Sequence, residues 1–116
     1  MNEITIKGQF DRAPDQRTID RPTGSVELTR ASLNFFSKRG DKDIRMWVDV
    51  EAVGNKAHEL ASIPLNADVT ITGRLERAAW QDKETDEWRS KHFIRYESSE
   101  HEGANKAAKD YDDLPF

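Results

Sequence analysis

Strict alternation of apolar and polar residues over positions 44–53 constrains the fold of this chain more than any other feature. The apolar positions are Ile44, Met46, Val48, Val50 and Ala52. Because successive side chains point to opposite faces of a strand, this period of two predicts a half-buried β-strand. The same period places Trp47 on the polar face of that strand.

Two other segments show the same alternation. Residues 3–10 alternate with Gly8 in the apolar register, which predicts a strand with a bend or a close backbone approach at the glycine. Residues 69–75 alternate as well, and the same parity carried forward places Trp80 on the outward face. Between them, residues 11–25 contain Pro14, Pro22 and Gly24 and are predicted to form turns.

The remaining segments carry weaker patterns. Over residues 25–37 the apolar parity slips by one residue between Leu28 and Ala31, which predicts a β-bulge and leaves Phe36 pointing outward. Residues 55–61 place apolar side chains at helical spacings behind Asn55, so we expect one or two helical turns with Asn55 as N-cap. Residues 84–97 are predicted to form the last strand, with large residues at both parities.

The order of these elements is three strands, a short helix and a long two-stranded hairpin. This order predicts a mainly all-β fold, a five-stranded OB-fold Greek-key barrel with one short helix between its third and fourth strands. An SH3-like barrel is the structural alternative, but it does not normally place a helix there. A length of 116 residues fits one such domain, predicted over residues 1–98, with a flexible tail over residues 99–116.

The charges are unevenly distributed along the chain. Residues 1–98 carry 16 basic and 17 acidic residues, whereas residues 99–116 carry 2 and 5. The near-neutral body excludes a strongly basic polyelectrolyte binder, so a nucleic-acid role has to depend on a local patch or on stacking. The chain lacks cysteine, a signal-peptide pattern and a long apolar segment, so we expect a cytoplasmic protein without membrane association.

Aromatic residues interleaved with cations are the strongest candidate site. An indole on the wet face of a strand usually has a partner, which can be a nucleobase, a second subunit or a covering loop. The candidate stacking residues are Trp47, Trp80, Trp88 and Phe36. The candidate phosphate ligands are Lys38, Arg39, Arg45, Arg74, Arg77 and Lys91. Rings and cations in this arrangement favour binding of single-stranded nucleic acid.

Catalytic and metal-binding patterns are missing from the sequence. His58, His92 and His101 do not share metal-ligand spacing with other ligands. The carboxylates are scattered, and there is neither a nucleophile motif nor a phosphate-cradling glycine loop. We therefore expect a non-catalytic protein without a metal or another cofactor.

The segment "DYDDLPF" at residues 110–116 joins an acidic run to an apolar triplet. The predicted docking tip consists of Asp112, Asp113, Leu114, Pro115 and Phe116. Proline stiffens the segment, phenylalanine can enter an apolar pocket, and a basic rim around such a pocket would attract the carboxylates. This pattern indicates a peptide that docks on another protein.

Taken together, these segments resemble the bacterial and phage single-stranded DNA-binding proteins, the SSB family, over nearly the whole chain. The resemblance lies in "ITIKGQFDRAPDQR", "MWVDVEAVG", "ITGRLERAAWQDKETDEW" and above all "YDDLPF". It implies sequence-independent binding of single-stranded DNA, with bases stacked on Trp47 and Trp80. It also implies a tip that recruits replication, recombination and repair proteins, and a homo-oligomer, either tetramer or dimer, in the cytoplasm, or in the host cytoplasm for a phage-encoded member.

The chain departs from the family pattern at several positions. Val53 replaces a frequent stacking aromatic, Ala78 and Ala79 replace usual basic residues, and Asp49 replaces a frequent arginine. These departures predict weaker DNA binding, or a DNA path shifted toward Phe36, and the short tail indicates a phage, plasmid or accessory member. The alternative function is an accessory OB-fold protein-interaction module of a replication or primosome complex, with weak nucleic-acid binding.

Overall fold

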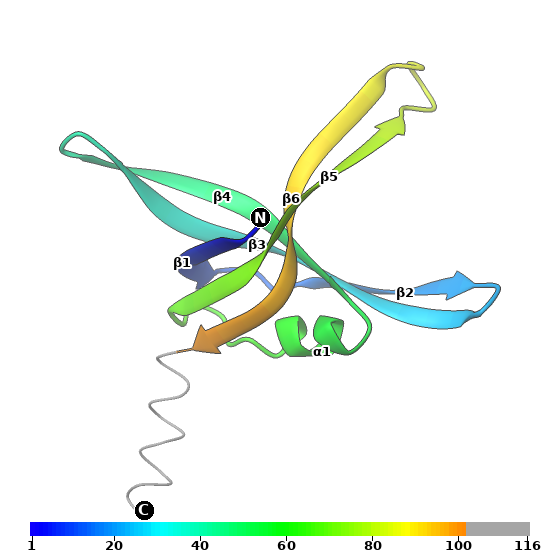
Figure 1. The fold of residues 1–116 in the computed structure, drawn as a ribbon, viewed down its shortest axis with the longest axis horizontal. Helices are drawn as coiled ribbons and strands as arrows, with labels where there is room; N and C mark the ends of the chain where they lie inside the picture. The colour runs from blue at the N-terminus through cyan, green and yellow to red at the C-terminus, as the bar shows by residue number, and fades with distance from the viewer. Residues whose placement is uncertain (102–116) are drawn as a thin grey trace, which may run out of the picture.

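The computed structural model describes residues 1–101, which form a closed five-stranded barrel with one short helix (Figure 1). The barrel strands are β1 (Ile4–Phe10), β3 (Gly24–Arg39), β4 (Lys42–Val53), β5 (Val69–Gln81) and β6 (Trp88–His101). They follow the order β1-β5-β6-β4-β3, and β1 also pairs with β3, which closes the ring. Helix α1 (Asn55–Ala61) lies between β4 and β5 in the sequence, so the predicted OB-fold barrel is confirmed.

The last strand ends past the predicted domain boundary. Strand β6 continues to His101, beyond residue 98. The predicted docking tip at residues 112–116 lies outside the described residues. Within residues 1–101, no helix has the length and apolar character needed to cross a membrane.

Three hairpins extend beyond the barrel as arms (Figure 1). The β3–β4 and β5–β6 arms are the far ends of barrel strands. The third arm pairs β3 with β2 (Asp15–Arg21), a segment for which the sequence predicts turns. That prediction was wrong because all residues of β2 are exposed, so burial imposes no apolar alternation on the strand.

The core consists of the inward side chains of all five barrel strands. Leu33, Val50, Ile71 and Ile94 are each 0% exposed, one from each of four strands. Helix α1 covers one end of the barrel and buries Ala57 and Leu60 against these strands. Burying each aliphatic side chain contributes about 1.5–3 kcal/mol, so this cluster is the main source of stability.

The β-bulge predicted in β3 is not present. The register between β3 and β4 is continuous from Leu28 to Arg39. Thr29 instead takes the inward position next to Ala31, 2% exposed, and its hydroxyl donates a hydrogen bond to the carbonyl of Ala57 at 2.8 Å. A buried hydroxyl is tolerated when it is hydrogen-bonded. Because the inward residue here is a polar threonine, the apolar pattern looked as if it shifted by one residue, although the strand is regular.

A register shift does occur in β6. Thr72 pairs with Ser98 whereas Gly73 pairs with Tyr96, which leaves Glu97 without a partner across the ladder. Such a bulge exchanges the faces of the residues that follow it. Because the bulge changes which parity faces the core, large residues occur at both parities of β6. This is one reason why the sequence does not decide the faces of this strand.

The start of α1 also differs from the prediction. Gly54, not Asn55, is the N-cap, and no side chain caps the helix. The backbone of Gly54 has φ of 70°, which glycine adopts without strain. Its N–H donates to the carbonyl of Glu27 at 2.9 Å, so this turn ties the helix to β3.

Gly8 lies where β1 changes partners from β5 to β3. It pairs with Val69, and the next residue, Gln9, pairs with Asn34. A Cβ at Gly8 would overlap the carbonyl oxygen of Asn34, so the predicted close backbone approach is confirmed.

Gly8→Ala is therefore expected to lower the free energy of unfolding by about 1–3 kcal/mol, because the added methyl forces the closing strands apart. Urea denaturation followed by circular dichroism measures the change. Thr5→Ser, on the exposed face of the same strand, should change it by less than about 0.5 kcal/mol. Equal stability of the Gly8 variant and the wild type would contradict this account of the closure.

Candidate nucleic-acid interface

The outer face of the β3–β4 arm carries two exposed aromatic rings. Asn34 pairs with Trp47, and Phe36 pairs with Arg45. Residues that are opposite each other in an antiparallel ladder share a face, so both rings and the guanidinium lie on one side of the arm. Trp47 is 69% exposed and Phe36 70%, which confirms the outward placement predicted for both.

A hollow of about 550 Å³ lies beside the indole of Trp47, and we refer to it as the Trp47 groove. Its lining residues are Asp11, Arg12, Ser32, Asn34, Arg45 and Trp47. Arg45 Nη2 lies 3.1 Å from Asp11 Oδ2 and donates to Asn34 Oδ1 at 3.3 Å. The groove therefore combines an aromatic wall with a guanidinium that neighbouring side chains hold in place.

The β5–β6 arm carries the other two tryptophans, on opposite faces. Trp80, 44% exposed, pairs with Arg89, whereas Trp88, 73% exposed, pairs with Gln81. Because adjacent positions alternate in direction, Trp80 shares its face with Arg89, and Trp88 lies on the other side. At the tip of the arm, Asp82 accepts bonds from the Glu84 N–H and from Arg89 Nε, each at 2.8 Å, and these bonds lower the pKa of its carboxyl group.

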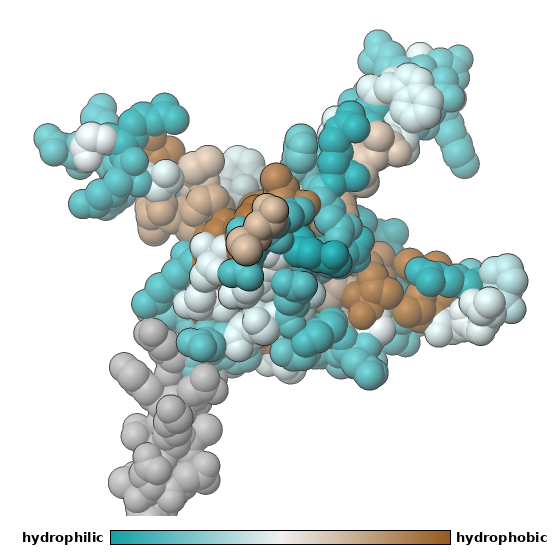
Figure 2. Space-filling model, viewed as in Figure 1, coloured by the Kyte–Doolittle hydropathy of each residue, from teal (hydrophilic) through white to brown (hydrophobic). Residues whose placement is uncertain are grey.

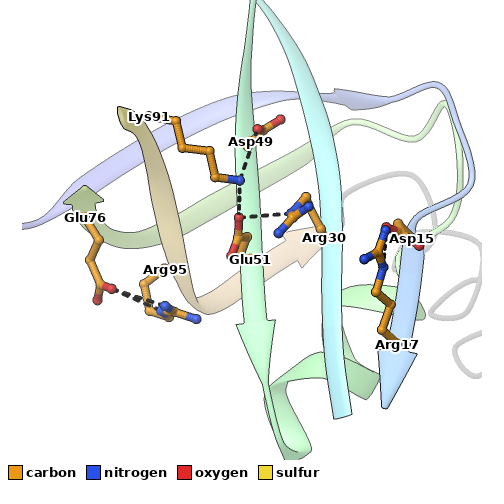
Figure 3. A network of polar contacts seen from close by, with 8 residues as sticks. All are labelled: Asp15, Arg17, Arg30, Asp49, Glu51, Glu76, Lys91 and Arg95. Carbon is orange, nitrogen blue, oxygen red and sulfur yellow. Dashed lines mark hydrogen bonds and ion pairs between the residues drawn. The ribbon is translucent and has the colours of Figure 1, made fainter. Parts of the chain in front are cut away.

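A network of ion pairs joins the two aromatic faces (Figure 3). Lys91 lies on the same face as Trp80, since it pairs with Ala78. Its Nζ lies 2.7 Å from Glu51 Oε2 and 3.8 Å from Asp49 Oδ2 on β4, the strand of Trp47. The Trp47 and Trp80 faces are thus two parts of one surface, with this network between them.

Glu51 is the centre of the network. It is 6% exposed and also accepts a bond from Arg30 Nε at 3.0 Å. Burial alone would raise the pKa of the Glu51 carboxyl group, but the hydrogen bond from Lys91 and the charges of Arg30 and Lys91 outweigh it. The pKa of Glu51 is therefore held below its ordinary value of 4.5.

This shift makes the stability depend on pH. Because the folded pKa of Glu51 is depressed, its ionised form stabilises the fold above pH 4.5, and this contribution is lost as the pH falls further through the folded pKa. Glu51→Gln is expected to lower the free energy of unfolding by about 1.5–3 kcal/mol near neutral pH, the contribution of hydrogen bonds to charged groups. Urea melts at neutral and acidic pH should show the difference shrinking on acidification, and a constant difference would contradict it.

Phe93 is a member of this surface that the sequence did not reveal. It pairs with Glu76 on the outer face of the hairpin, yet it is only 4% exposed. Lys91 Nζ lies 5.5 Å and Arg95 Cζ 5.0 Å from the centre of its ring, so two cations cover it. In the sequence Phe93 is only one of several large residues that occupy both parities of this strand.

The predicted phosphate ligands fall into two groups. Arg45, Arg74 and Lys91 are all in ion pairs with carboxylates, and Arg74 lies 3.5 Å from Glu76 and 3.7 Å from Glu97. In the described part of the chain, the cations without an ion pair include Lys38, Arg39 and Arg77. The first two lie at the tip of the β3–β4 arm, beyond Phe36.

Tyr96 and its hydrogen-bond partners form a second polar cluster, next to α1. Within residues 1–101, no three His, Cys, Asp or Glu side chains are grouped so that they could hold a metal ion. The Tyr96 hydroxyl donates to Glu59 Oε1 at 2.9 Å, and Ser99 Oγ lies between it and His101 Nε2. Burial, reinforced by the Glu59 charge, raises the pKa of Tyr96 to about 12, so this phenol stays neutral as a structural group.

Comparison of the chain with models of protein families and with curated proteins finds no match.

Proposed function

We propose that this protein is a non-catalytic, sequence-independent single-stranded DNA-binding protein. The observation that carries the proposal is the exposure of Trp47, Phe36 and Trp80 on faces of two arms that meet at one polar network. Flat, exposed rings beside cations are what single-stranded binders use, because every base has a face that can stack. The resemblance of the sequence to the SSB family supports the same function.

Stacking dominates the expected binding energy. Each base stacked on an aromatic ring contributes about 1–3 kcal/mol, so three rings suffice for useful affinity. The phosphate contribution is smaller, since several cations on this surface already pair with carboxylates. We therefore expect a weaker salt dependence than that of a strongly basic binder.

The unpaired cations suggest the direction of the strand. From the Trp47 groove, the DNA would pass over Phe36 toward Lys38 and Arg39 at the tip of the β3–β4 arm. In the other direction it would cross the network toward Trp80. One OB-fold unit of this kind covers about 4–16 nucleotides.

The biological role that we propose is in DNA replication, recombination and repair, with partners recruited through residues 112–116. An accessory module that mainly bridges proteins is the second candidate, and the carboxylates that pair with Arg45 and Lys91 favour it. Phe116→Ala separates the two. In the leading proposal it should abolish capture of replication and repair proteins while DNA affinity is maintained, because the substitution leaves the acidic residues of the tip and the proposed stacking rings unchanged.

Titration of the intrinsic tryptophan fluorescence with oligo-dT is the direct test of DNA binding. Stacking on Trp47 and Trp80 should quench the emission at low salt, and a double-stranded oligonucleotide of the same length should quench it far less. Unchanged emission with oligo-dT at low salt would remove the proposal and leave the accessory module.

A further inference from the structure

Strand β2 forms an open edge of the sheet. Among the described residues it pairs only with β3, over Asp15–Arg21, and all its side chains are exposed. An edge strand without proline, glycine or a bulge in its interior presents a row of unpaired backbone groups. These groups can form a ladder with another strand.

The hairpin geometry identifies the outward-facing groups. Antiparallel ladders alternate between residues bonded to the neighbouring strand and residues whose N–H and C=O point away from it. Arg21 and Gly24 flank a two-residue turn, so they occupy a bonded position. Every second residue counted back from Arg21 is bonded to β3. The backbone N–H and C=O groups of the residues between them, which are Gln16, Thr18 and Asp20, therefore point to the free edge.

We propose that this edge pairs with the β2 edge of a second copy of the chain, antiparallel about a two-fold axis at Thr18. In this register Asp15 lies opposite the second copy's Arg21, and this pair occurs twice. Gln16 lies opposite Asp20 of the second copy, and both belong to the set with free backbone groups. When two copies of β2 run antiparallel in this register, the acidic residue at one end of each strand thus faces the basic residue at the other end of its partner.

The neighbouring registers are less favourable. An axis at Arg17 would place that residue opposite its own copy, and an axis at Ile19 would place Arg17 opposite Arg21. Like charges directly opposite each other destabilise a strand pair, whereas opposite charges stabilise it. An axis between two residues would pair a free backbone with one already bonded to β3, which the ladder does not allow.

Apolar surface on this arm supports the same partner. Figure 2 shows brown surface on the β2–β3 arm. Ile19, 36% exposed, pairs with Val26, so the two side chains share a face. In the proposed register the two copies of Ile19 become diagonal neighbours, which is close enough for contact between long side chains. The apolar strip would then continue across the axis.

One local contact competes with the proposed pair. Arg17 lies 3.1 Å from Asp15 on the same face of β2, and both side chains are largely exposed (Figure 3). An exposed pair of this kind contributes little, so it does not prevent Asp15 from also meeting an arginine across the interface.

Charge reversal tests the register in the absence of DNA, so its result is independent of the proposed DNA binding. Light scattering coupled to size exclusion should give the full chain a mass of twice 13.3 kDa, or a multiple of that dimer. Asp15→Arg alone, or Arg21→Asp alone, should raise the dissociation constant of this pairing about tenfold or more, because two attractive pairs become repulsive.

Mixing the two single variants provides the rescue. In the mixed pair, each Arg at position 15 or 21 meets an Asp, so a heterodimer should form at the wild-type affinity. Thr18→Pro is a second variant, since it removes an outward N–H and leaves the bonds to β3 intact. It should give a smaller assembly whose circular dichroism spectrum matches that of the wild type.

A wild-type monomer at submillimolar concentration would overturn the proposal. An assembly that neither reversal weakens, or a mixture that fails to restore pairing while both variants are folded, would overturn it as well. A wild-type tetramer that the single reversals convert to dimers supports the β2 pairing as one of two interfaces.

Discussion

Trp47→Ala is expected to lower the affinity for oligo-dT tenfold or more. The ring is 69% exposed beside a hollow large enough for a base, so its loss removes a stacking contribution of about 1–3 kcal/mol. Because the substitution removes part of the intrinsic signal, anisotropy of a labelled oligonucleotide at low salt is the appropriate measurement. Trp80→Ala should act in the same direction, through the second arm.

Trp88→Ala is the matched control. It removes the same ring from the same hairpin as Trp80, but from the opposite face. We expect less than a twofold change in affinity and an unchanged melting temperature. Equal losses of oligo-dT affinity for the Trp47, Trp80 and Trp88 variants would contradict a single binding surface. An unchanged affinity of the Trp47 variant would contradict the location of that surface beside the Trp47 groove.

Glu51→Gln is expected to act in the opposite direction and raise the affinity about three- to tenfold at low salt. The substitution removes a negative charge between the two aromatic faces and releases Lys91 and Arg30 to meet phosphates. Each additional phosphate contact increases the slope of log affinity against log salt by about 0.7 for a single strand. A salt titration therefore reports the released cations separately from the affinity itself.

Glu59→Gln controls for the change in net charge. Glu59 lies on α1, away from the network, and a glutamine oxygen can still accept the Tyr96 hydroxyl. Its affinity and salt slope should equal those of the wild type. If Glu51→Gln binds no better than this control, the network is only structural and the DNA does not cross it.

The barrel and the outward aromatics were predictable because a strand with one buried face alternates between apolar and polar residues. Strand β4 has one face in the core, so its alternation fixed both the strand and the direction of Trp47. Phe36 and Trp80 followed from the parity of neighbouring core residues. Where one face of a strand is buried, a shift of one residue would expose the whole apolar set, so the pattern is strongly constrained.

The features that sequence reasoning missed are those that long-range contacts decide. Strand β2 is exposed throughout, so only its ladder with β3 makes it a strand. Thr29 is inward because a carbonyl of α1 accepts its hydroxyl. Phe93 is buried on an outer face under Lys91 and Arg95, and carboxylates on β4 and β5 hold these two cations in place. None of these partners could be identified before the chain was folded.

The site follows the same division. Residue types alone identified Trp47, Trp80, Phe36 and the cations as candidates. They could not show that Arg45 and Lys91 are held by carboxylates, since Asp11, just after β1, and Glu51, on β4, are far from these cations in the sequence. The separation of Trp88 from Trp80 depended on the exact register of the hairpin.

The closure of the barrel by β1 has a consequence for biosynthesis. Strand β1 leaves the ribosome before β5, its main partner, and the bonds between Asn2 and Leu75 span 73 positions of the chain. Contacts so distant in sequence slow folding, because a long loop has to be ordered before they form. During translation β1 must therefore keep the edge that pairs with β5 open until β5 has emerged, so the barrel cannot close while β5 is still being synthesised.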